Sequence, residues 1–107
     1  MWYIYMIRCG DNSLYTGISN DVLKRFKVHQ SGSAKAAKYT RNRHPLQLVF
    51  SAEIGDKSAA SRAEYRLRKL PKRSKELLIT GKTSLLNLGV IEKSISDCVA
   101  RTQSDRN

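Results

Sequence analysis

The sequence predicts a single domain of the α+β class, built from a β-hairpin, a third strand and several helices. Three observations favour this class. The chain has 107 residues, the usual size of one domain. Strand-forming residues gather at 2–8, 13–18 and 46–54, whereas apolar residues recur at helical spacing over 22–30 and 58–70. Hydrophobic residues make up 40% of the chain, which is typical of a protein with a packed core.

The first two strands are predicted to form a hairpin. Residues 2–8 and 13–18 are rich in tyrosine, isoleucine, threonine and leucine, and residues 9–12 between them carry turn-forming glycine, aspartate and asparagine. In the first strand Tyr3, Tyr5 and Ile7 point to one side, and apolar residues also occupy the alternate positions. Both faces therefore need covering, which places this strand at the centre of a sheet.

A helix is predicted to follow the hairpin, over residues 22–30. A polar cluster at residues 19–21 offers an N-cap, the apolar seam consists of Val22, Leu23 and Phe26, and Gly32 ends the helix. Residues 31–45 are basic and show no core periodicity, so we expect a loop.

The second half of the chain predicts one strand and more helices. Apolar and polar residues alternate over 46–54, and Gly55 ends this strand. A helical stripe of alanines and leucines spans 58–70, with Asp56 or Ser58 as its cap and Pro71 after its end. Residues 73–80 and roughly 84–100 also read as helical, with interruptions expected at Gly81 and at Gly89, whereas 101–107 are polar and expected to fray.

The net charge points to a polyanionic partner. Twenty lysines and arginines against nine acidic residues leave a charge of +11, which attracts nucleic acid. Composition alone leaves open a basic protein kept soluble by its charge, one bound to anionic lipid, or one within a ribonucleoprotein. The chain has no apolar run of spanning length and no secretory signal, so we expect no membrane and a cytoplasmic protein. Cys9 and Cys98 lie far apart and are expected to be reduced thiols.

A set of motifs resembles the signature of the GIY-YIG nuclease superfamily. Tyr3-Ile4-Tyr5 occupies the "GIY" position and Tyr15-Thr16-Gly17 the "YIG" position, with nine residues between Tyr5 and Tyr15. The runs LYTGISNDVLKRFKVHQSG and AEYRLRKL are similar to small stand-alone bacterial members. The resemblance covers roughly residues 2–80. It implies a small antiparallel three-stranded β-sheet flanked by α-helices, with a catalytic domain over 1–80, a packed helical extension over 81–100 and a flexible tail over 101–107.

The resemblance also assigns a catalytic set. Its members are Tyr5, Tyr15, Arg25, His29 and Glu64. Cross-strand pairing can bring the two tyrosine hydroxyls together, although they could equally be core aromatics. Arg25 and His29 share one helix face, where Arg25 suits a phosphate and His29 can move a proton near neutral pH. The alternative is a surface pair of Arg25 with Asp21 and a solvated His29.

Glu64 is the candidate metal ligand. It is the only carboxylate in its helix and borders the apolar stripe. One carboxylate suits Mg²⁺ (or Mn²⁺), because Mg²⁺ keeps several waters and takes further ligands from substrate phosphate. The alternative is an i,i+4 ion pair with Arg68, and both can hold if Arg68 positions the carboxylate.

Two groups of basic residues are candidates for contacts with the nucleic-acid backbone. They are Lys35, Lys38, Arg41 and Arg43 in the loop, and Lys69, Lys72 and Arg73 after the glutamate helix. Backbone contacts position a nucleic acid without reading its sequence, and the alternative is a solvated surface.

The function implied by the resemblance is metal-dependent hydrolysis of DNA phosphodiester bonds, directed by structure rather than sequence. Ile18 departs from the pattern, because many members have a lysine after the "YIG" glycine. That departure favours an alternative, a non-catalytic DNA- or RNA-binding module with the same fold. A nuclease subunit that needs a protein partner for substrate recognition is a second alternative, and a basic partner-binding scaffold is a third. The sequence leaves open DNA against RNA, the preferred nucleic-acid structure and the oligomeric state.

Overall fold

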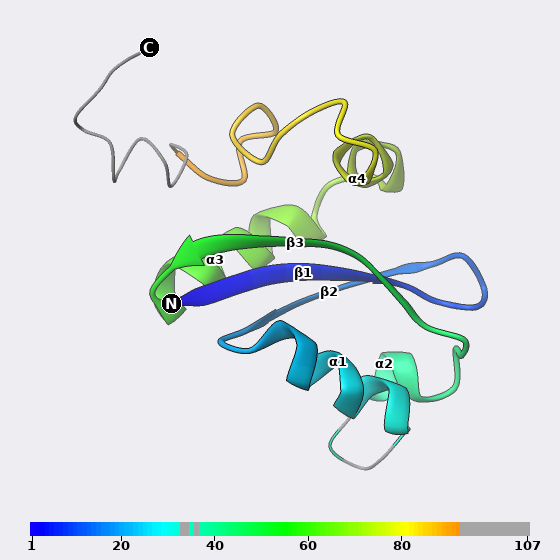
Figure 1. Ribbon diagram of the computed structural model, residues 1–107. Helices are drawn as coiled ribbons and strands as arrows, with labels where there is room; N and C mark the ends of the chain where they lie inside the picture. Colours follow the sequence, from blue (N-terminus) through cyan, green and yellow to red (C-terminus); the bar gives the residue numbers. More distant parts are fainter. Residues whose placement is uncertain (33–34, 36, 93–107) are drawn as a thin grey trace.

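The protein forms a three-stranded antiparallel sheet with helices on both faces. The structure, a computed structural model, describes residues 1–32, 35 and 37–92. The elements are β1 (Trp2–Arg8), β2 (Leu14–Ser19), α1 (Val22–Ser31), α2 (Lys38–Arg41), β3 (Gln47–Gly55), α3 (Lys57–Arg68) and α4 (Lys72–Ile79). The strand order is β2-β1-β3 (Figure 1). The α+β class, the antiparallel sheet and the central position of the first strand are therefore confirmed.

Alternation along β1 divides the core between the two faces of the sheet. Ile4 and Met6 point to the face covered by α3, where they join Ala63 and Leu67 of that helix. Tyr5 and Ile7 point to the opposite face, where Phe26 of α1 packs against them. Figure 1 shows α3 and α4 on one side of the strands and α1 and α2 on the other. The central strand is buried on both faces because the residues of both faces are apolar.

Register between the strands determines which side chains meet. In the β1–β2 pair Tyr5 is opposite Gly17, and Ile7 is opposite Tyr15. Tyr5 and Tyr15 are thus diagonal neighbours on one face, a separation that long aromatic side chains can span. β2 is an edge strand of the sheet.

Side-chain caps fix where the helices begin. The carboxylate of Asp21 accepts a hydrogen bond from the amide of Lys24 at the start of α1. Asp56 accepts one from the amide of Ala59, so Asp56 rather than Ser58 caps α3. Gly32 ends α1 in the left-handed conformation (φ 67°) and donates its amide to the carbonyl of His29. Glycine adopts this conformation without strain, so α1 ends at Ser31, two residues after His29.

Two expectations about local structure were wrong. The loop expected over 31–45 contains the short helix α2, which has a single buried residue, Thr40. Residues 84–92, expected to be helical, form turns and bends instead. Gly81 and Gly89 take left-handed φ values of 78° and 75°, which an α-helix does not allow. The rest of that predicted helix, 93–100, and the tail, 101–107, lie outside the described residues.

The segment after α4 nevertheless belongs to the main core. Leu85 and Val90 are buried in the same cluster as Ile4 and Leu67. The carbonyl of Val90 also accepts a hydrogen bond from Arg66 of α3. As far as the structure describes the chain, no helix is long and apolar enough to span a membrane.

Candidate active site

The side chain of Tyr5 lies over Gly17 of the edge strand β2. A Cβ added at Gly17 would lie 2.5 Å from Oη of Tyr5 and 2.7 Å from its Cζ. The ring of Tyr5 therefore occupies the space that a side chain at position 17 would fill, and it is almost fully buried. Glycine is required here for close approach, and it sets the position of the Tyr5 hydroxyl.

A buried chain of hydrogen bonds connects Tyr5 to helices α1 and α2. Oη of Tyr5 lies 2.9 Å from Nε2 of His29, and Nδ1 of His29 lies 2.9 Å from Oγ1 of Thr40. Thr40 donates its only hydroxyl proton to the carbonyl of Ala37 at 3.0 Å. Thr40 must therefore accept a proton from Nδ1 of His29, which leaves Nε2 unprotonated in the neutral imidazole. It follows that Tyr5 donates its hydroxyl proton to His29.

Burial keeps both members of this pair neutral. It raises the pKa of Tyr5 to about 12, with a further increase from Tyr15 and an opposing effect of Arg25. Burial also lowers the pKa of His29 to about 4, and the positive charge of Arg25 adds to this effect. At neutral pH the proton therefore stays on Tyr5 and His29 offers an acceptor lone pair.

Arg25 is beside this pair, one turn before His29 on α1. Its guanidinium donates a 2.7 Å hydrogen bond to the carbonyl of Lys35, which ties it to the segment after α1. The expected alternative of a surface pair with Asp21 is not formed among the described residues, because the Asp21 carboxylate caps α1. The other half of that alternative, a solvated His29, is also wrong, because His29 is fully buried.

Tyr15 completes an aromatic cluster on the same face. Its ring centroid lies 6.4 Å from that of Tyr5, 5.2 Å from that of His29 and 5.8 Å from that of Tyr39 on α2. The pKa of Tyr15 is raised, chiefly by burial. The positive charge of Arg25 opposes this increase, and the negative charge of Glu64 adds to it. Glu64 also contributes to the raised pKa of Tyr5, so both phenols lie within range of its charge.

Glu64 reaches the site from the other face of the sheet. It is the only acidic residue of α3, and its side chain is 24% exposed. Its carboxylate is 4.0 Å from the guanidinium of Arg68, the outer limit of an ion pair, and Arg68 itself is 66% exposed. The alternative of an ion pair is thus present but loose, and the carboxylate remains accessible.

The donor set fits a weakly held, hard divalent cation. No group of three or more histidine, cysteine or acidic side chains that could hold a metal occurs in the described parts of the chain. A single carboxylate at a solvent-accessible edge is consistent with Mg²⁺, which keeps several of its waters, and not with a fully protein-ligated ion.

The candidate backbone-binding residues lie in two separate places. Lys35, Lys38 and Arg41 are exposed around α2. Arg43 is held by the carboxylate of Asp11 at 3.1 Å and by the carbonyl of Tyr39 at 2.8 Å, with its guanidinium over the Tyr39 ring. Arg43 is therefore engaged within the fold.

The second group surrounds the junction of α3 and α4. Lys69 lies over the ring of Tyr65, Lys72 is 3.9 Å from the carboxylate of Glu76, and Arg73 is exposed.

Three residues near the site were not singled out from the sequence. Thr40 sets the tautomer of His29, and Tyr39 stacks beside Tyr15. Lys75 is half-buried, with its ammonium 3.5 Å from the carbonyl of Arg68. Burial lowers the pKa of Lys75, and the charge of Arg68 lowers it further. Only tertiary packing distinguishes these residues. Tyr39 and Thr40 lie in a helix too short to show an apolar periodicity, and Lys75 is one of many lysines in the sequence.

Comparison with known proteins identifies the family of this chain. A family model described as the GIY-YIG catalytic domain matches residues 1–77. A UPF0213 protein of Citrobacter koseri is 54% identical over 79 residues, which is 74% of this chain and 77% of that protein. A UPF0213 protein of Cronobacter sakazakii is 55% identical over 80 residues, which is 75% of this chain and 82% of that protein.

Among solved structures, the solution NMR structure of a UPF0213 protein from Bacillus halodurans is 41% identical. The match covers 83% of this chain and 94% of that one, with a TM-score of 0.48. The family match spans both tyrosines, Gly17, Arg25, His29 and Glu64. The chain therefore belongs to the GIY-YIG family of nucleases.

Proposed function

We propose that this protein is a metal-dependent endonuclease that hydrolyses DNA phosphodiester bonds. The observation that carries the proposal is the buried hydrogen bond from Tyr5 to an unprotonated Nε2 of His29, next to Arg25 and within range of Glu64. A phenol that already donates its own proton to a base has lone pairs free to accept one from water.

In this proposal His29 is the final proton acceptor. As water attacks phosphorus, its proton passes to Oη of Tyr5 while the Tyr5 proton passes to Nε2 of His29. The apo pKa of His29, about 4, opposes this transfer because burial and Arg25 disfavour the imidazolium. A bound phosphate would offset the charge of Arg25 and raise the pKa of His29 towards neutrality. Tyr15, which is less buried, is the alternative acceptor for the water proton.

Arg25 and a metal ion held by Glu64 would stabilise negative charge on the phosphate. Arg25, always protonated, would bind the non-bridging oxygens and stabilise the charge that builds up in the transition state. Glu64 would hold Mg²⁺ or Mn²⁺. Such an ion, when bound, supplies Lewis-acid stabilisation of the departing oxygen.

A cleavage screen tests the proposal. Labelled single-stranded, duplex, nicked, flapped and branched DNA, together with RNA, are incubated with the protein in Mg²⁺, Mn²⁺ or EDTA. We expect cleavage of DNA in either metal and none in EDTA. Glu64→Gln should abolish cleavage with near-normal DNA affinity, because it removes the metal ligand without adding bulk. Arg25→Ala should weaken both, because it removes a phosphate contact. Cleavage by Glu64→Gln at the parent rate would overturn the metal assignment.

The alternative is a DNA- or RNA-binding module without catalysis, and one observation favours it. Ile18 packs into the core on the α3 face, so the site has no cation at the position where the family pattern often has lysine. This alternative predicts tight binding with no product under any condition of the screen. A nuclease subunit that needs a protein partner would also give no product alone, but would cleave once a cell extract supplied that partner.

A further inference from the structure

The outward face of α3 combines an exposed aromatic ring with several cations. Tyr65 is 62% exposed, the highest value among the large aromatic side chains of the described residues. Lys69 lies over its ring, with the ammonium 4.7 Å from the centroid. Around Tyr65 the surface is hollowed, with a volume of about 480 Å³, and this hollow is lined by Ser58, Ser61, Arg62, Tyr65 and Arg66. We call this surface the outer α3 face.

Arg62, Arg66 and Lys69 of the outer α3 face form no ion pair with a carboxylate within the described structure. The guanidinium of Arg62 donates to the hydroxyl of Ser58 at 2.8 Å, and that of Arg66 donates to the carbonyl of Val90 at 3.3 Å. Both partners are uncharged. Among the ion pairs formed by the described residues, Arg68 is the only cation of α3 with a carboxylate partner, and that contact is 4.0 Å long.

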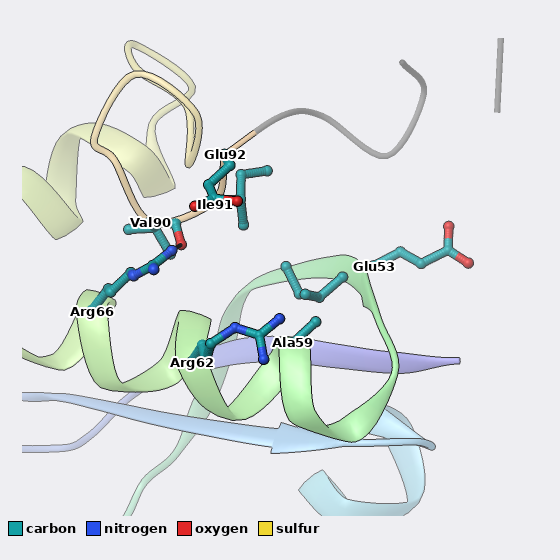
Figure 2. Close-up of a pocket in the computed structure, with 8 residues that line it drawn as sticks. Glu53, Ala59, Arg62, Arg66, Val90, Ile91 and Glu92 are labelled. Atoms are coloured by element: carbon teal, nitrogen blue, oxygen red, sulfur yellow. Dashed lines mark hydrogen bonds between the residues drawn. The ribbon is translucent and has the colours of Figure 1, made fainter. Parts of the chain in front are cut away.

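Besides Glu64 at its near border, this face has two acidic residues, Glu53 and Glu92, at the border away from Glu64. Arg62 and Arg66 rise from α3 into a neighbouring pocket of about 160 Å³, which is also lined by Glu53 and Glu92 (Figure 2). In that view the side chain of Glu53 points away from both arginines. The positive surface therefore extends from this border around the helix towards Glu64.

The outer α3 face is continuous with the candidate metal ligand. With about 3.6 residues per turn, Arg68, Ser61 and Tyr65 come next around α3 from Glu64, followed by Lys69, Arg62 and Arg66. The buried stripe of Ala60, Ala63 and Leu67 lies on the other side of Glu64. A polymer bound at Glu64 can therefore pass directly onto this face, opposite to the side where α1 supplies Arg25 and His29.

We propose that the outer α3 face is a nucleic-acid-binding surface that holds the DNA backbone on the side of the metal ligand away from α1. Arg62, Arg66 and Lys69 contact phosphates, and the ring of Tyr65 packs against a nucleotide between them. Unpaired cations around an exposed aromatic ring suit a polyanion with regularly spaced apolar groups, which is the chemistry of a nucleic acid. This inference deepens the proposed function and rests on it for the position of the cleaved phosphate.

A charge-matched pair of variants tests the electrostatic part. Arg62→Gln/Arg66→Gln removes two positive charges from the outer α3 face. Lys24→Gln/Lys27→Gln removes two exposed charges from the side of α1 facing away from Arg25 and His29. Affinity for a fluorescent 30-mer duplex is measured in EDTA over a range of salt concentrations. For the first variant we expect the slope of log K against log salt to become shallower by about 1.8, the value for two lost phosphate contacts. The second should keep the parent slope. Equal slopes for the two variants would overturn the proposal.

Two substitutions at Tyr65 test the aromatic part. With a single-stranded 30-mer as the probe, Tyr65→Ser should weaken binding about tenfold, the order of loss expected for one aromatic contact with an unpaired nucleotide, whereas Tyr65→Phe should bind like the parent. The side chain is exposed, so neither change should alter the melting temperature. Parent affinity for Tyr65→Ser would remove Tyr65 from the interface.

The same binding measurements separate this inference from the proposed function. They are made without metal, so they do not depend on cleavage. A protein that never cuts DNA but loses affinity only with the α3 variant would overturn the nuclease proposal and support this surface. If the protein cuts DNA and the α3 variant binds and cuts like the α1 control, the nuclease proposal is supported and the outer α3 face is overturned as a binding surface.

Discussion

The hydroxyl of Tyr5 and Nε2 of His29 form a buried 2.9 Å hydrogen bond between the central strand β1 and helix α1. The two residues are 24 positions apart in sequence, and both are buried. Because Thr40 fixes the imidazole tautomer, the direction of this bond is also fixed, from phenol to imidazole. The stability of the fold and the proposed chemistry therefore depend on the same pair.

The two tyrosines should respond differently to replacement by phenylalanine. Tyr5→Phe removes the donor to a fully buried imidazole nitrogen, which should cost about 1–3 kcal/mol of unfolding free energy. Tyr15→Phe should leave stability unchanged, because Tyr15 is less buried and its hydroxyl makes no hydrogen bond within the described structure. Each change should slow cleavage roughly 10²-fold or more if the hydroxyl takes part in proton transfer.

Urea unfolding and single-turnover cleavage measure these two effects separately. Tyr15→Phe is the more decisive variant, because its fold is expected to be intact. If Tyr15→Phe cuts DNA at the parent rate while Tyr5→Phe is slow, the catalytic role belongs to Tyr5 alone. Parent rates for both variants would show that both hydroxyls are outside the chemistry.

Acid should destabilise the protein through His29. Its folded pKa of about 4 lies below its ordinary value of 6.5, so the unfolded chain binds this proton more readily. The stabilisation from a neutral His29 is therefore fully present above pH 6.5 and is lost as pH falls towards 4. The full loss is on the order of 3 kcal/mol, since one pKa unit corresponds to about 1.4 kcal/mol.

The unfolding free energy at pH 7 and pH 4.5 measures this effect. His29→Gln cannot titrate, so the difference between the parent and this variant should shrink as the pH falls. His44→Gln is the matched control, because His44 is exposed, and it should follow the parent at both values. A constant difference between parent and His29→Gln would mean that His29 titrates alike in the folded and unfolded states.

Gly17→Ala should displace the Tyr5 hydroxyl. The added methyl group would lie 2.5 Å from Oη and 2.7 Å from Cζ of a buried ring, so the ring must move. Overpacking of this kind typically costs about 1–3 kcal/mol, and movement of the ring also breaks the bond to His29. The same substitution in a Tyr5→Leu background should cost much less, because the clash is absent. Equal costs in the two backgrounds would locate the strain elsewhere.

Much of the fold could be predicted from local patterns in the sequence. Alternating apolar residues located the strands, and apolar residues on both faces of β1 placed it at the centre of the sheet. Capping residues and helical spacing located α1 and α3 to within one or two residues. These features depend on neighbours in sequence, so the chain determines them locally. The interruptions at Gly81 and Gly89 were also predicted, but the helix expected after Gly81 does not form over 84–92, where both glycines take left-handed φ values and the chain makes turns and bends.

The sequence by itself determined which residues are candidates for the site, because its motif pattern identified Tyr5, His29 and Glu64. Only the tertiary structure decided how they are arranged. The direction of the bond from Tyr5 to His29 depends on Thr40, whose helix has no apolar periodicity, and the position of the Tyr5 ring depends on the bare backbone of Gly17. Burial, which shifts the pKa values of Tyr5 and His29 in opposite directions, results from packing between elements distant in sequence, and so no local pattern specifies it.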